Sequence, residues 1–79
     1  MRDWTLPAFR WTHSHLDLLE RAIRERRRVA LVRRGNEYVV TAARLTTVRQ
    51  RDALICIAPM TGDEMTFVLD DVEGFRIVE

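Results

Sequence analysis

The stretch EYVVTAARLTTV, residues 37–48, decides the fold. It is rich in β-branched residues and contains neither glycine nor proline, so it predicts one long, continuous strand. A strand of this length in a chain of 79 residues has to bend strongly, and we expect a β-bulge near Ala42 and Ala43. The bent strand would then contribute to two sides of a small barrel.

Shorter strands are predicted on both sides of this stretch. Before it, residues 29–32 form an apolar strand, and the following hairpin turn offers Gly35 and Asn36 for positive φ angles. After the polar turn at 49–52, the expected segments are strands at 54–58, 65–69 and 75–78, a hairpin loop at 60–64 and a one-turn connector at 70–73. Pro59 ends the first of these strands, since proline cannot donate to a ladder.

A helix is predicted to precede the strands. Ser14 and Asp17 have the spacing of a capping box, which marks a helix start. Leu16, Leu19 and Ile23 then recur at helical spacing and form an apolar stripe, which Leu18 and Ala22 widen. The arginines that follow complement the negative end of the helix dipole, and we expect the helix to cover residues 14–27.

The predicted fold is therefore a single, mainly β domain with one N-terminal α-helix. Residues 28–79 would form a five-stranded, strongly bent antiparallel barrel of the Sm-like or SH3-like kind, with the last strand beside the first. Residues 1–12 form an arm that carries Trp4, Phe9 and Trp11. These aromatic rings either pack on the core as a lid or bind a partner.

Charge is distributed unevenly along the chain, and every basic side chain except histidine is an arginine. Residues 1–51 carry twelve arginines and five acidic residues, a net charge of +7, whereas residues 52–79 carry one arginine and seven acidic residues, a net charge of −6. This asymmetry indicates either a surface for an anionic partner or internal compensation. In the second case Asp70, Asp71 and Glu73 would approach the arginines of residues 24–34.

The sequence contains no enzyme signature that we can identify. It has no glycine-rich phosphate loop, nucleophile elbow or paired-cysteine spacing, and the single cysteine, Cys56, lies in an apolar run. His13 and His15 are two residues apart, which suits a helix cap or the surface better than a metal site. No apolar stretch approaches the roughly 20 residues that span a bilayer. We expect a cytoplasmic, non-enzymatic protein without cofactor, metal or membrane partner.

An arginine cluster is the candidate nucleic-acid surface. Guanidinium groups suit contacts with phosphate, and a nearby tyrosine can stack on a base. The candidate residues are Arg24, Arg27, Arg28, Arg33, Arg34 and Tyr38. They predict an RNA-binding or single-strand-binding barrel as one possible function.

Several short motifs resemble the Rof family, whose members are small modulators of Rho-dependent transcription termination. The motifs are residues 17–22 (DLLERA), Gly35 in its turn, residues 43–45 (ARL), residues 62–64 (GDE) and residues 67–72 (FVLDDV). The resemblance spans roughly residues 15–78 and implies an N-terminal helix, an Sm-like barrel and a protein-binding module that docks on the Rho hexamer. Residues 61–72 also resemble the end of WYL domains, which sense nucleic-acid or nucleotide ligands.

In the Rof family, acidic residues of the helix meet the basic RNA-binding surface of Rho. The matching acidic residues here are Asp17 and Glu20, and with Arg21 and Arg24 they form the candidate protein-partner surface. Three functions thus stay open: a Rof-like module, an RNA-binding barrel, and a structural homo-oligomer assembled through unpaired edge strands. The expected state is a monomer or a small homo-oligomer.

Overall fold

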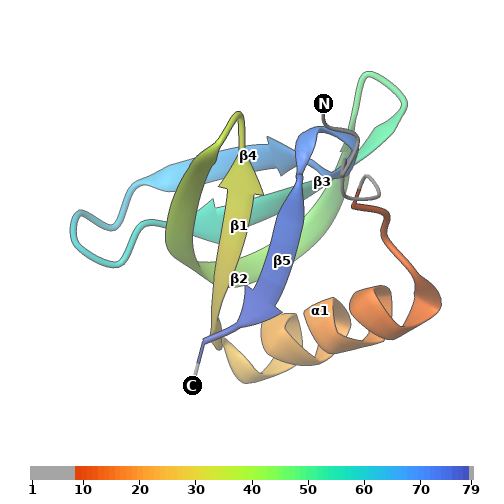
Figure 1. The fold of residues 1–79 in the computed structure, drawn as a ribbon. Helices are drawn as coiled ribbons and strands as arrows, with labels where there is room; N and C mark the ends of the chain where they lie inside the picture. Colours follow the sequence, from red (N-terminus) through yellow and green to blue (C-terminus); the bar gives the residue numbers. More distant parts are fainter. Residues whose placement is uncertain (1–8, 79) are drawn as a thin grey trace, which may run out of the picture.

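One helix and five strands follow each other along residues 9–78, the part of the chain that this computed structural model describes (Figure 1). The helix, α1, covers His13–Glu25. The strands are β1 (Arg28–Arg33), β2 (Asn36–Val48), β3 (Arg51–Ile57), β4 (Glu64–Val68) and β5 (Gly74–Ile77). A single 3₁₀ turn, η1 (Leu69–Asp71), joins β4 to β5 where a one-turn connector was predicted.

The strands form one antiparallel sheet in the order β4-β3-β2-β1-β5. The last strand therefore lies beside the first, as predicted. The sheet curls strongly around the core (Figure 1), but β4 and β5 are its two edges and are not paired with each other. The mainly β fold with an N-terminal helix is thus confirmed, whereas the sheet is open and a closed barrel is not confirmed.

The long strand β2 has the predicted bend. Its first half pairs with β1 and its second half with β3, so a single strand serves both sides of the curled sheet. The register with β3 shifts between Ala42 and Arg44, which leaves Ala43 as the extra residue of a bulge. Before the bulge Ala42 faces the core, and after it Leu45 lies opposite the buried Leu54.

The helix begins one residue earlier and ends two residues earlier than the predicted range of 14–27, and its N-cap lies two residues before Ser14. Thr12 is the N-cap: its Oγ1 accepts the His15 N–H at 3.2 Å, and the Thr12 N–H donates to Nδ1 of His15 at 3.3 Å. The capping box predicted at Ser14 and Asp17 is therefore wrong. Both hydroxyl residues are competent caps, and tertiary packing decides between them, because the His15 ring lies 5.0 Å from the ring of Phe9.

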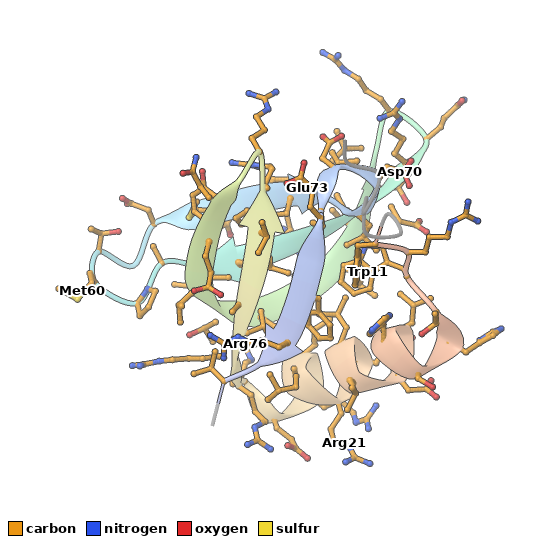
Figure 2. The ribbon with its side chains drawn as sticks, in the orientation of Figure 1. Trp11, Arg21, Met60, Asp70, Glu73 and Arg76 are labelled. Atoms are coloured by element: carbon orange, nitrogen blue, oxygen red, sulfur yellow. The ribbon has the colours of Figure 1, made fainter. Side chains whose placement is uncertain are left out.

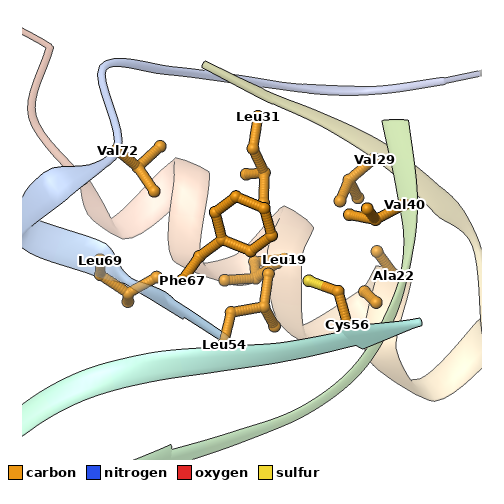
Figure 3. Close-up of a cluster of buried hydrophobic side chains, with 11 residues drawn as sticks. Leu19, Ala22, Val29, Leu31, Val40, Leu54, Cys56, Phe67, Leu69 and Val72 are labelled. Carbon is orange, nitrogen blue, oxygen red and sulfur yellow. The ribbon is translucent and has the colours of Figure 1, made fainter. Parts of the chain in front are cut away.

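The core lies between the inner face of the sheet and one side of α1 (Figure 3). Phe67 from β4 is its largest fully buried side chain. The helix contributes Leu19 and Ala22, neither of which is exposed to solvent. This packing fixes the rotation of α1 about its axis and turns the opposite side of the helix outward.

Two hairpin turns and the helix end use positive φ angles at residues other than glycine. The β1–β2 turn has positive φ at Arg34 and Gly35, where Gly35 and Asn36 were predicted, so the Asn36 prediction is wrong. Asn36 instead pairs with Arg33 as the first residue of β2. The β2–β3 turn has φ of 51° at Arg49 and 67° at Gln50. Both turns match the twist that two-residue hairpins require.

The described part of the arm packs on the body of the protein. The rings of Phe9 and Trp11 meet edge to face at 5.2 Å, and the Trp11 ring lies 5.1 Å from that of Phe75 in β5. Residues 9–12 thus act as a lid over this part of the core. Trp4, the third aromatic residue of the predicted arm, lies outside the described residues.

Candidate interaction surface

The outward side of α1 carries the four residues predicted to meet a protein partner. Asp17, Glu20, Arg21 and Arg24 are all exposed, and their spacing of three and four positions places them on one face of a helix. Figure 2 shows Arg21 extending from α1 away from the sheet. We call these four residues the α1 stripe, and the structure brings all of them together.

Charge is graded along the α1 stripe. Its acidic residues lie toward the start of the helix and its arginines toward the end. None of the ion pairs found among residues 9–78 involves a member of the stripe; they join Arg27 to Glu25, Arg44 to Glu64 and Arg76 to Glu37. The stripe therefore presents a dipolar charged surface to a partner.

Two shallow hollows with aliphatic side chains flank the α1 stripe. On one side, a hollow of about 300 Å³ is lined by Glu20, Ile23 and Arg24 of α1 and by Leu45 of β2. On the other side, a hollow of about 140 Å³ is lined by Leu18, Arg21, Ala22, Arg27 and Ile77. Leu18 and Leu45 remain 42% and 38% exposed. A charged ridge between two apolar hollows can bind a partner through both polar and hydrophobic contacts.

Sequence reasoning missed the hollows for an identifiable reason. Leu18 was expected to widen the apolar stripe of α1, but it lies about 100° from the buried Leu19 around the helix and is largely exposed. Leu45 and Ile77 reach the helix only through the curl of the sheet. No local signal in the sequence reports such contacts.

The five arginines of the candidate nucleic-acid surface fall into two groups at opposite ends of β1, and Tyr38 lies in β2 beside the middle of β1. Arg24, Arg27 and Arg28 lie where α1 meets β1, and Arg33 and Arg34 lie at the β1–β2 turn. At a rise of about 3.3 Å per residue, the Cα atoms of Arg28 and Arg33 are about 17 Å apart. The six residues therefore do not form one continuous patch.

Two of the six residues are held in a cluster with the core. The Arg33 guanidinium lies 4.5 Å from the centroid of the Phe67 ring and 5.2 Å from that of Tyr38, and its Nη1 donates to the Thr66 carbonyl at 3.3 Å. The rings of Tyr38 and Phe67 meet at 5.4 Å. These cation–π and ring contacts occupy Arg33 and Tyr38 within the protein.

The acidic C-terminal segment approaches the β1–β2 turn without neutralising its arginines. A carboxylate oxygen of Glu73 accepts the backbone N–H of Gly35 at 3.1 Å, which follows from the adjacency of β1 and β5. Asp70 and Asp71 form no ion pair with the arginines described between residues 9 and 78. Compensation of charge is carried instead by glutamates of α1, β2 and β4.

Cys56 belongs to the core, as its apolar neighbours predict. Its side chain is fully buried, and this burial raises the pKa of the thiol from 9.0 to about 12. The thiol is therefore protonated at neutral pH and is not an activated nucleophile.

Residues 9–78 offer neither a cluster of metal ligands nor a helix that could span a membrane. They contain no group of three or more histidine, cysteine, aspartate or glutamate side chains arranged to hold a metal ion. No helix within the same residues has both the length and the apolar character needed to cross a membrane.

Comparisons of the chain with protein-family models, with curated proteins and with solved structures find no match. The resemblance to the Rof family thus rests on the short motifs quoted above.

Proposed function

We propose that this chain is a non-enzymatic regulatory module that binds another protein through the α1 stripe, and that its partner, following the Rof resemblance, is Rho. The observation that carries the proposal is the position of Asp17, Glu20, Arg21 and Arg24 on one exposed face between two apolar hollows. The strand order and the bulged β2 also agree with the Sm-like fold that the resemblance implies.

In the proposed complex, the charged residues and the apolar residues of this surface have different roles. Asp17 and Glu20 would steer the helix toward a basic surface and set its orientation, because complementary charges act mainly on association rate and specificity. Leu18 and Leu45 would supply apolar surface that becomes buried when the partner binds. Removing the acidic charges should therefore weaken binding most strongly at low salt.

The test is the affinity of the purified chain for purified Rho, measured by biolayer interferometry, together with termination in a reconstituted transcription assay. We expect micromolar or tighter binding and inhibition of termination. The double variant Asp17→Arg/Glu20→Arg should bind at least tenfold more weakly. Asp63→Arg, a single charge reversal in the exposed β3–β4 loop, should bind like the wild-type chain.

Two results would contradict this proposal. One is the absence of binding between the wild-type chain and Rho at micromolar concentrations. The other is an equal loss of affinity in Asp63→Arg and in the α1 double variant. Circular dichroism of each variant verifies that the fold is retained.

RNA binding is the second candidate, and the exposed arginines at the junction of α1 and β1 favour it. Arg24, Arg26 and Arg28 are exposed and form no ion pair within the described chain. Binding through these groups would release counterions from phosphate, so affinity for a labelled single-stranded RNA should fall steeply with salt. Arg24→Ala/Arg28→Ala should reduce the slope of log K against log salt. A lack of RNA binding at low salt would remove this candidate.

A further inference from the structure

The edge strand β4 has backbone groups that are not bonded to β3 and that point out of the sheet. Hydrogen-bonded pairs alternate along an antiparallel ladder. The β2–β3 hairpin closes on the pair Val48–Arg51, so every second residue of β3 from Arg51 onward bonds to β2. Leu54 lies between two such residues and therefore bonds to Phe67 of β4. Thr66 is the next residue of β4, so its N–H and C=O point away from β3. The bond from Arg33 to the Thr66 carbonyl reaches that outer side.

Arginines lie at the middle and at the C-terminal end of this edge, whereas its first residue, Glu64, is paired with Arg44. Arg33 lies at Thr66, in the middle of β4. At the end of the strand, Arg49 and Arg51 line a hollow of about 530 Å³ together with Val48 and Val68. None of these three arginines forms an ion pair with a carboxylate of residues 9–78, although Arg51 also lines a neighbouring hollow with Asp52 and Asp70.

The other edge of the sheet has different surroundings. The ring of Phe75 in β5 is covered by the rings of Trp11, at 5.1 Å, and His15, at 6.2 Å. Helix α1 also runs beside β5, whereas β4 lies at the opposite side of the sheet (Figure 1). Of the two edges, β4 therefore combines backbone groups that lie outside the ladder with arginines that form no ion pair among residues 9–78.

We propose that the open edge of β4 binds an extended acidic peptide segment by strand addition. The backbone of the peptide pairs with the outward N–H and C=O of Thr66, and its acidic side chains meet Arg33 at mid-strand and Arg49 and Arg51 at the strand end. In the absence of a peptide, the Arg33 guanidinium donates to the Thr66 carbonyl and so protects this edge from pairing with another strand. The site is separate from the α1 stripe and does not depend on the proposed binding of Rho.

The first test compares two labelled ten-residue probes by fluorescence anisotropy: one alternates threonine with glutamate and the other alternates threonine with lysine. We expect the glutamate peptide to bind at least tenfold more tightly, with an affinity that falls as salt is added. Amide chemical shifts of the ¹⁵N-labelled chain should change along β4, with the largest change at the Thr66 N–H.

The second test uses Thr66→Pro. Proline removes the outward N–H of Thr66, which is not part of the β3–β4 ladder, so the sheet can form while strand addition is blocked. Thr66→Val keeps this N–H and is the matched control. We expect at least tenfold weaker binding of the glutamate peptide by Thr66→Pro and wild-type binding by Thr66→Val. Arg49→Glu/Arg51→Glu leaves the β4 backbone unchanged and should reverse the preference between the two probes.

Several outcomes would overturn the proposal. They are equal or absent binding of both probes, an unchanged affinity in Thr66→Pro, an unchanged preference in Arg49→Glu/Arg51→Glu, and chemical-shift changes confined to α1 or β5. Self-association of the wild-type chain that Thr66→Pro abolishes, seen by light scattering without peptide, would assign the edge to a second copy of the chain instead.

Discussion

The indole N–H of Trp11 donates to the backbone carbonyl of Leu69, 2.9 Å away. This bond ties the arm to the 3₁₀ turn η1 between β4 and β5. The same indole packs against Phe9 and Phe75, so one side chain connects the arm, the connector and the last strand. The labelled Trp11 in Figure 2 lies between the start of α1 and this end of the sheet.

Replacing Trp11 should separate the hydrogen bond from the ring contacts. Trp11→Phe keeps an aromatic ring but loses the donor, and we expect the free energy of unfolding to fall by about 1 kcal/mol. Trp11→Ala also loses the ring contacts, and the loss should reach about 3 kcal/mol. Urea unfolding followed by circular dichroism measures both values. Equal stability of the wild type and Trp11→Phe would show that the hydrogen bond makes no net contribution.

The capping box at Thr12 predicts that removing its hydroxyl lowers the stability of the chain more than removing the hydroxyl of Ser14. Thr12→Ala removes the acceptor for the His15 N–H and should lower the free energy of unfolding by about 1 kcal/mol. Ser14→Ala should change it by less than about 0.5 kcal/mol, because Ser14 is exposed within the first turn of the helix. Thermal unfolding of both variants tests this order, and a larger loss in Ser14→Ala would reverse the assignment of the cap.

Local sequence patterns predicted the elements and their order well, because those patterns depend on near neighbours. The β-branched run of residues 37–48 predicted a long strand, and its length in so short a chain predicted the bulge that Ala43 forms. The choice of Thr12 over Ser14 as the cap could not be predicted, since it depends on rings that come from the arm and from β5. Closure of the sheet also depends on the twist of all five strands together.

In the candidate interaction surface, too, local sequence patterns predicted what depends on near neighbours and missed what depends on distant contacts. The α1 stripe follows from helical spacing alone, and all four of its residues are on the exposed face. The nucleic-acid set combined residues that are close in sequence but lie at opposite ends of β1. The Arg33 guanidinium makes a cation–π contact with Phe67, a residue 34 positions away, and no local sequence pattern predicts that contact.

The β2–β3 turn is predicted to be a place where the chain can be stabilised. Arg49 and Gln50 both have positive φ angles, which cost residues with a Cβ atom about 1 kcal/mol each, whereas Asn-Gly fits this turn. Arg49→Asn/Gln50→Gly should therefore raise the free energy of unfolding by about 1–2 kcal/mol. The urea midpoint of the double variant measures the gain.

A glycine in the other hairpin turn is the matched control for this effect. Gly35 has φ of 76°, and a Cβ atom there would meet nothing within 4 Å. Gly35→Ala should therefore lose about 1 kcal/mol through backbone strain alone. An unchanged midpoint in both variants would mean that these turns relax without cost.

Cys56 gives the chain a pH-dependent loss of stability in the alkaline range. Burial raises the pKa of this thiol from 9.0 to about 12, so the folded state keeps its proton where the unfolded chain releases it. The stabilising contribution is therefore complete below about pH 9 and is lost as the pH rises toward 12, with a limiting slope of about 1.4 kcal/mol per pH unit.

Cys56→Ala lacks the thiol, and its cavity costs the same at every pH. The difference in unfolding free energy between wild type and Cys56→Ala should thus be constant from pH 6 to 8 and shift steadily against the wild type from pH 9 to 11. A difference that stays constant up to pH 11 would mean that the thiol ionises equally in both states, and rapid labelling of the folded chain by a thiol reagent at pH 8 would contradict its burial.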